Sequence, residues 1–166
     1  TLASWHGVDI LLEALVDLKG KVDFKLHIVG DGPDYTSLYD LTYELDLKDH
    51  VTFHGMVTKD QLYKLYEKCN LAVGTLNWSS VGVYESSPIK NREYSLVGLP
   101  FIYAGYDIDY AESDVAYRLK EENLRSEIVN YITKIYVSDS LPSPQKCNKF
   151  AIDFLTYDFK LNDFFN

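Results

Sequence analysis

The chain has 166 residues, of which 46% are hydrophobic and 14% aromatic, and its formal net charge is −9. This length favours one domain around one hydrophobic core, and the apolar content excludes a disordered chain. The acidic charge excludes a nucleic-acid groove, because affinity for a phosphate backbone depends on clustered lysine and arginine. No unbroken apolar run approaches the roughly 20 residues of a membrane-spanning helix, so we expect no membrane span.

The cysteines and histidines indicate neither a disulfide framework nor a metal site. Cys69 and Cys147 are isolated and form no Cys-x-x-Cys pair, which is typical of a reducing cytoplasm. His50 and His54 flank a predicted strand instead of sharing a helix face, and we interpret them as non-ligands. The sequence has no initiator methionine or signal peptide, so we expect residue 1 to be an internal cut in a longer protein.

Helix and strand patterns alternate along most of the chain. The predicted elements, in chain order, are a helix at 8–18, a strand at 25–29, a helix at 35–45, a strand at 51–54, a helix at 58–68, a strand at 71–74, a helix at 89–97, a strand at 101–104, a short strand at 116–119, and helices at 126–137 and 144–154. Such alternation buries its strands as a parallel sheet covered on both faces. The sequence therefore predicts a Rossmann-like, doubly wound α/β domain over residues 1–166, with a helical tail at about 144–166.

The segment that follows the strand at 71–74 carries the most informative side chains. Ligands of open α/β sheets bind at the carboxyl ends of strands, beside helix N-termini. Ser87 is a good N-cap and Pro88 a good first helical residue, so we expect a helix to begin there with its free amides in a cleft. Glu93 shares the apolar stripe of this helix. Its carboxylate is interpreted either as half of a local ion pair with Arg92 or Lys90, or as the acceptor of two adjacent ribose hydroxyls.

These residues form part of an ordered set of motifs. The motifs are Trp5-His6-Gly7-Val8-Asp9, Gly30-Asp31-Gly32-Pro33, Val51-Thr-Phe-His-Gly55, Glu85 spaced by seven residues from Glu93, and Ser87-Pro88-Ile89-Lys90 through Glu93-Tyr94 with Gly98-Leu99-Pro100. Together, over roughly residues 1–105, they resemble the C-terminal, nucleotide-sugar-binding domain of the retaining GT-B glycosyltransferases, group 1 or family 4-like. The resemblance implies one half of a GT-B fold, with the N-terminal acceptor domain absent from this chain.

The resemblance also implies roles for individual residues. Glu93 would bind the ribose, and Glu85 would act on the donor sugar as a ligand or electrostatic partner. The remaining donor-binding residues implied are Ser86, Ser87, Pro88 and Ile89 for the sugar and diphosphate, Gly55, Met56 and Val57 against the nucleobase, and Gly32, with Asp31 and Pro33, in the loop beside the cleft. Amides at a helix N-terminus suit this task because they carry the positive end of the helix dipole.

The sequence departs from the family where an Arg and a Lys usually bind the diphosphate. Thr1 and His6 occupy those positions. We therefore expect that Lys90 or Arg92 replaces the missing positive charge, or that donor binding is weaker. Lys90 is the preferred catalytic cation. Its alternative interpretation is a solvated surface lysine. His6 is interpreted either as a phosphate contact or as a residue that structures its loop.

The implied activity is transfer of a sugar, with retention, from a nucleoside-diphosphate sugar to a glycan acceptor. The donor would be a UDP-sugar or a GDP-sugar, with no cofactor and no metal, and the fragment alone would be inactive without its acceptor domain. The expected location is the cytoplasm, with membrane association left to the missing domain. The alternatives are a degenerate, non-catalytic partner subunit, which the loss of both family cations favours, and another GT-B enzyme such as a nucleotide-sugar epimerase.

Overall fold

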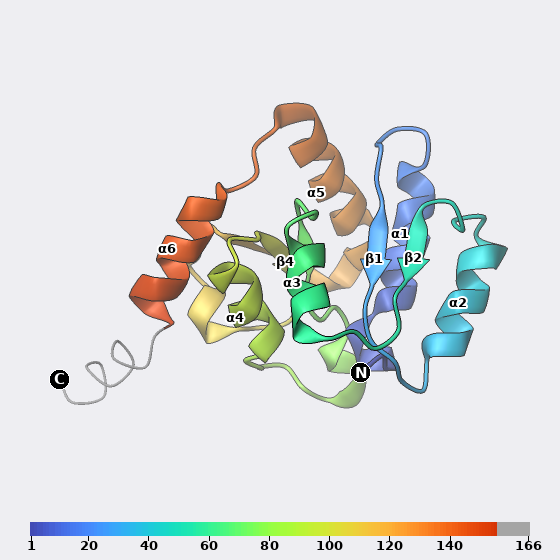
Figure 1. Cartoon of the computed structure of the whole chain (residues 1–166), viewed down its shortest axis with the longest axis horizontal. Helices are drawn as coiled ribbons and strands as arrows, with labels where there is room; N and C mark the ends of the chain where they lie inside the picture. Colours follow the sequence, from blue (N-terminus) through green and yellow to red (C-terminus); the bar gives the residue numbers. More distant parts are fainter. Residues whose placement is uncertain (156–166) are drawn as a thin grey trace.

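The computed structural model describes residues 1–155 and shows an α/β architecture (Figure 1). The elements are η1 Ser4–His6, α1 Val8–Leu18, β1 Leu26–Ile28, α2 Tyr35–Glu44, β2 Val51–Phe53, α3 Lys59–Tyr66, β3 Ala72–Val73, η2 Trp78–Val81, α4 Ile89–Leu96, β4 Phe101–Tyr103, η3 Ile108–Tyr110, β5 Ala116–Arg118, η4 Glu121–Asn123, α5 Leu124–Ser138 and α6 Pro144–Phe154. The predicted order of helices and strands is confirmed. The part of the predicted tail at 156–166 lies outside the described residues.

All the strand pairs described are parallel. β1 pairs with β2, with Leu26 opposite Val51, and β4 lies between β3 and β5. Among residues 1–155 the hydrogen bonds form two sheets, β1-β2 and β3-β4-β5, instead of the single sheet that the alternation predicts.

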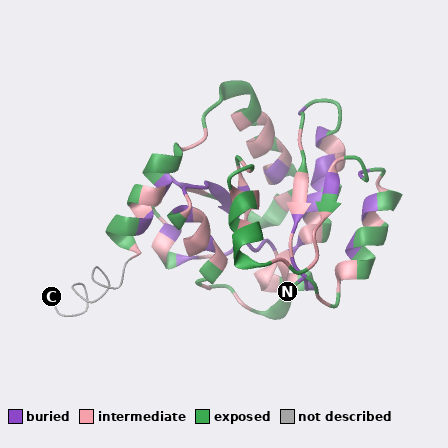
Figure 2. Ribbon diagram, in the orientation of Figure 1, coloured by how far each residue is buried: buried purple, intermediate pink, exposed green. Residues whose placement is uncertain are grey.

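Strand β4 shows that helices cover both faces of its sheet. Its side chains alternate between two apolar clusters: Phe101 and Tyr103 enter one, and Ile102 enters the other with Ala104, as the period of two of a strand requires. The cluster of Ile102 contains the inner face of α1 and part of α5, whereas that of Phe101 contains side chains of α4 and α6. Strand β4 is buried along its whole length, and Figure 2 shows exposed residues on the outer faces of the helices. The doubly wound fold class is therefore confirmed.

A capping box fixes the start of α3. The Thr58 hydroxyl accepts a hydrogen bond from the Gln61 amide at 3.3 Å, and the Thr58 amide donates to the Gln61 side chain at 2.8 Å. These are the reciprocal bonds that the sequence predicts for this position. The helix therefore begins at Lys59, directly after the loop that follows β2.

His27 on β1 and His54 after β2 form a cross-strand pair, with 3.0 Å between Nδ1 of His27 and Nε2 of His54. Burial lowers the pKa of His27, and the positive charges of His54 and Lys68 lower it further. The unfolded chain therefore binds a proton at His27 more readily than the folded chain does. This difference destabilises the folded chain as the pH falls below about 6.5.

We expect the melting temperature to fall between about pH 7 and pH 5, in the range where histidine titrates. Thermal unfolding followed by circular dichroism checks this expectation. His27→Gln should reduce the slope of melting temperature against pH. An unchanged slope in this variant would contradict a contribution from His27.

Candidate functional site

The loop that leads to α4 is tied to the carboxyl end of β4. Glu85 forms a parallel bridge with Tyr106, the Ser86 amide donates to the Tyr106 carbonyl at 2.9 Å, and the Tyr106 amide donates to the Tyr84 carbonyl at 3.1 Å. The exposed Glu85 and the first turn of α4 therefore lie together beyond the sheet edge, as the sequence predicts. The first amides of a helix have no acceptor within the helix and are free to bind an anion.

The predicted cap of α4 is wrong by one residue. Pro88, with φ −63° and ψ 130°, is the N-cap, and the helix begins at Ile89. The Ser87 hydroxyl does not cap the helix, because it lies 3.1 Å from Nη2 of Arg92 and accepts its hydrogen bond. The free amides of the first turn nevertheless remain next to the Ser86–Pro88 loop.

The predicted inner face of α4 is also wrong. Ile89 and Leu96 are 76% and 50% exposed, and the buried residues of the helix are Asn91 and Ser95. Partners beyond β4 bind both side chains: the Asn91 side-chain amide donates to Asp107, and the Ser95 hydroxyl lies 2.9 Å from that of Tyr110. The Asn91 Oδ1 has no hydrogen-bond partner within residues 1–155.

Lys90, in the first turn of α4, is a partly buried cation that forms no ion pair within residues 1–155. Its burial lowers the pKa of the ammonium group to about 8. Because partial burial of an ammonium group without a carboxylate partner is costly, the structure counts against the interpretation of Lys90 as a solvated surface residue. An anionic ligand would supply the missing counter-charge.

His6 lies near Lys90 but is occupied by its own loop. Burial lowers the pKa of His6, and the charge of Lys90 is the next cause. Nδ1 of His6 lies 3.2 Å from the Ala3 amide nitrogen and 3.1 Å from the Ala3 carbonyl oxygen. Of the two sequence interpretations, this geometry supports the role in structuring the loop. The low pKa keeps His6 neutral near pH 7, so Lys90 is the stronger candidate for the phosphate cation.

Glu93 lines a cavity of about 210 Å³ between α3 and α4. The lining residues are Val57, Thr58, Lys59, Leu62, Tyr63, Tyr66 and Glu93. Glu93 forms no ion pair in the described part of the chain, so the predicted pairing with Arg92 or Lys90 is wrong. Burial raises the pKa of Tyr66 to about 12, and the nearby Glu93 carboxylate contributes to the shift.

The structure brings together only part of the predicted base-binding segment. Val57 lines the same cavity as Glu93, whereas Met56 is 77% exposed and does not line it. Gly55 adopts a left-handed conformation with φ +61°, and its carbonyl accepts a hydrogen bond from the Gly30 amide at 2.8 Å. This bond connects the loop after β2 to the loop after β1.

Gly32 allows a close approach of two backbone segments. A Cβ atom at this position would lie 2.2 Å from the Leu2 carbonyl oxygen and 2.6 Å from the Leu2 nitrogen. The same segments are joined by the Leu2 amide, which donates to the Asp31 carbonyl at 2.8 Å. Gly32 therefore shapes the loop as the sequence predicts.

We expect Gly32→Ala to lower the free energy of unfolding by about 2–4 kcal/mol, because the new Cβ must displace backbone atoms. Gly55→Ala is the matched control, since its Cβ would meet nothing within 4 Å and would cost only the strain of a positive φ, about 1 kcal/mol. Urea unfolding of both variants measures the difference. Equal losses would contradict the close-approach role of Gly32.

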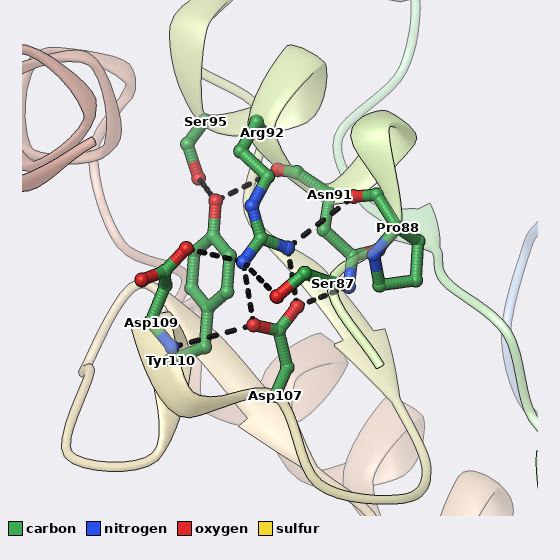
Figure 3. A network of polar contacts seen from close by, with 8 residues as sticks. All are labelled: Ser87, Pro88, Asn91, Arg92, Ser95, Asp107, Asp109 and Tyr110. Atoms are coloured by element: carbon green, nitrogen blue, oxygen red, sulfur yellow. Dashed lines mark hydrogen bonds and ion pairs between the residues drawn. The ribbon is translucent and has the colours of Figure 1, made fainter. Parts of the chain in front are cut away.

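Arg92 is held by carboxylates instead of being free for a phosphate (Figure 3). Its guanidinium forms ion pairs with Asp107 and Asp109, and Asp107 is 1% exposed. Compensation by Arg92 for the missing family cations is therefore not supported. Sequence reasoning missed both aspartates, although carboxylates placed just beyond the carboxyl end of a predicted strand are a usable signal.

A second hollow, of about 310 Å³, lies between α1 and α2. It is lined by Ala3, Ser4, Val8, Asp9, Asp34, Ser37, Leu38 and Leu41. It contains none of the residues predicted to bind the donor, and its two carboxylates would repel a diphosphate. The smaller cavity beside Glu93 is therefore the better candidate for an anionic nucleotide.

None of the helices within residues 1–155 is long and apolar enough to cross a bilayer. Within the same range no three His, Cys, Asp or Glu side chains converge in a way that could hold a metal ion.

Sequence comparison identifies related proteins. The family model described as Glycosyl transferases group 1 matches residues 1–151. An uncharacterized glycosyltransferase from Methanocaldococcus jannaschii is 31% identical over 96 residues, which cover 58% of this chain and 23% of that protein.

Solved structures share the fold. Sucrose-phosphate synthase from Thermosynechococcus elongatus matches 98% of this chain and 42% of its own, with a TM-score of 0.76 and 16% identity. The pneumococcal O-GlcNAc transferase GtfA, solved with UDP and GlcNAc, matches 96% of this chain and 32% of its own (TM-score 0.74, 16% identity). The match with the lipopolysaccharide outer core galactosyltransferase WaaB covers 98% of this chain and 44% of that protein, with a TM-score of 0.73 and 16% identity. The chain spans less than half the length of each of these proteins.

Proposed function

Because the chain belongs to the family of group 1 glycosyl transferases, we propose that it is the donor-binding half of a retaining glycosyltransferase that uses a nucleoside-diphosphate sugar. The observation that carries this proposal is Lys90, a partly buried cation in the first turn of α4 that has no carboxylate partner within residues 1–155. A diphosphate placed there would meet both the ammonium group and the free amides of the helix start.

The second support is the position of Glu93 in the cavity that Val57 also lines. A carboxylate without an ion pair can accept hydrogen bonds from the two adjacent hydroxyls of a ribose, and the apolar Val57 offers a surface for the base. We propose that the nucleoside occupies this cavity and that the diphosphate extends from it towards Lys90.

The proposed reaction needs stabilisation of the leaving group more than it needs a protein nucleophile. The acceptor hydroxyl attacks the anomeric carbon on the face from which the diphosphate departs, the bond from that carbon to the phosphate oxygen breaks, and the hydroxyl proton passes to the departing phosphate. Lys90 and the amides of Ile89 and Lys90 would stabilise the negative charge that grows there. Glu85, exposed at the edge of the same loop, would contact the donor sugar.

We propose that the acceptor site lies in an N-terminal domain outside this chain, so that this chain alone binds donor without transferring sugar. The relatives support this proposal because each is more than twice as long as the segment that matches. The donor is proposed to be a UDP-sugar or a GDP-sugar, and the UDP bound in the GtfA structure makes UDP the first nucleotide to test. The acceptor is proposed to be a glycan, with the reaction in the cytoplasm.

A non-catalytic partner subunit is the alternative that Thr1 and His6 favour, since neither supplies the family's usual cations. Ligand-observed NMR against UDP, GDP, ADP and their common sugar conjugates separates the two proposals. If the chain binds a donor, one class of nucleotide should give binding signals with the unaltered chain and none with Glu93→Ala. Absence of binding by every nucleotide would count for the partner subunit.

A further inference from the structure

The guanidinium of Arg92 joins two loops that are distant in sequence (Figure 3). On one side its Nη1 lies 3.3 Å from the Pro88 carbonyl oxygen and its Nη2 3.1 Å from the Ser87 hydroxyl. On the other side both nitrogens bind the carboxylate of Asp107, and Nη2 also binds Asp109. One side chain thereby fixes the N-cap of α4 to the segment that follows β4.

The ion pair between Arg92 and Asp107 is shielded from solvent and has a fixed geometry. The Asp107 side chain is 1% exposed and that of Arg92 16%, so solvent screens their attraction weakly. Asp107 also accepts a hydrogen bond from the side-chain amide of Asn91 at 3.1 Å. The Arg92 guanidinium lies 5.2 Å from the centre of the Tyr110 ring. A bidentate arginine–carboxylate pair fixes geometry as well as charge.

We propose that Arg92 and Asp107 are positioning residues, which hold the Ser86–Pro88 loop so that the first amides of α4 and Lys90 face the donor diphosphate. This inference rests on the proposed function. Arg92 itself does not bind the diphosphate, because both of its terminal nitrogens are used within the clamp formed by Ser87, Pro88, Arg92, Asp107 and Asp109.

The test uses the full chain with Arg92→Met and Asp107→Asn, and measures the Kd of UDP and of GDP by calorimetry. Each variant should weaken binding of the nucleotide that binds the unaltered chain by about tenfold. Asp107→Asn gives the sharper result. It removes a negative charge and releases Arg92, so an arginine that bound phosphate directly would bind as tightly or more tightly in this variant. Unchanged or tighter binding in Asp107→Asn overturns the proposal.

Arg125 and Asp17 form a matched control pair. They also make a bidentate contact, at 2.8 and 3.0 Å, but they join α5 to α1. Arg125→Met and Asp17→Asn should leave the nucleotide Kd within twofold of the unaltered chain. Loss of binding in these controls as large as that in the Arg92 variants would show a general effect on stability and would overturn the positioning role.

Amide hydrogen exchange of the nucleotide-free chain tests the clamp separately from donor binding. The Ser86 amide is bonded to the Tyr106 carbonyl, and its exchange should accelerate at least tenfold in Arg92→Met and Asp107→Asn, with α1 unchanged. Unchanged exchange at Ser86 overturns the clamp whether or not a nucleotide binds. Accelerated exchange in a chain that binds neither UDP nor GDP would confirm the clamp and contradict the proposed function.

Discussion

Replacing Lys90 with methionine is expected to raise the melting temperature and to abolish binding of nucleoside diphosphates. Burial holds the pKa of Lys90 at about 8, well below the usual value near 10.4, so the charged form destabilises the folded chain at neutral pH. Methionine keeps much of the length of the side chain without the charge. From the size of the pKa shift we expect a gain of about 1–3 kcal/mol at pH 7, or roughly 2–12 °C in the melting temperature.

The pH dependence of this effect has a definite sign. Between about pH 8 and pH 10.5 the unfolded chain holds the Lys90 proton more readily than the folded chain, so Lys90 makes stability rise with pH in that window. In Lys90→Met, stability should no longer rise with pH in this window. Nucleotide binding to the unaltered chain should weaken as the pH rises through about 8, and Lys90→Arg should retain binding there.

Calorimetric binding and thermal unfolding of the same samples check both parts of the Lys90 prediction. Lys146→Met is the matched control, because Lys146 pairs with Asp114 at the surface and such pairs contribute about 0–1 kcal/mol. A Lys90→Met chain that is less stable and still binds nucleotide would identify a structural lysine.

Replacing Glu93 with glutamine is expected to weaken nucleotide binding by about 10- to 100-fold, because hydrogen bonds to a charged acceptor contribute roughly 1.5–3 kcal/mol. The amide keeps the shape of the side chain but accepts hydrogen bonds through only one oxygen. The loss should depend on the ribose. A 2′,3′-dideoxynucleoside diphosphate should bind the unaltered chain and Glu93→Gln with similar affinity.

The control for Glu93 is Glu67→Gln, which removes the same charge from an exposed position just after α3. It should leave the nucleotide Kd within twofold. If Glu93→Gln weakened the ribonucleotide and the dideoxynucleotide equally, Glu93 would act through the charge or shape of the cavity and not as a ribose acceptor.

The order and type of the elements follow from local periodicity, whereas the orientation of α4 does not. Its eight residues carry apolar side chains at Ile89 and Leu96, which suggest an inner face. The buried face instead contains Asn91 and Ser95, because Asp107 and Tyr110 lie opposite them and form hydrogen bonds with their side chains. These partners follow β4 in the chain, and no pattern within the helix reports them.

In the candidate site, too, the positions of residues in the chain follow from local sequence patterns, whereas the contacts of their side chains do not. Strand–helix alternation is enough to predict that Gly32 and Glu85 lie in loops that follow strands and that Glu93 lies within the next helix. The state of each side chain depends on tertiary neighbours. The Ser87 hydroxyl accepts a hydrogen bond from Arg92 and does not cap α4. Arg92 is paired with Asp107, and Lys90 is partly buried without an ion pair within residues 1–155.

The most direct test of the donor site is an amide NMR titration of the labelled chain with UDP and with GDP. The donor-site account predicts that one nucleotide shifts the amides of Val57 and Glu93, which line the cavity between α3 and α4, and those of Ile89 and Lys90 in the first turn of α4. Shifts confined to Asp34, Ser37 and Leu38, around the hollow between α1 and α2, would contradict it.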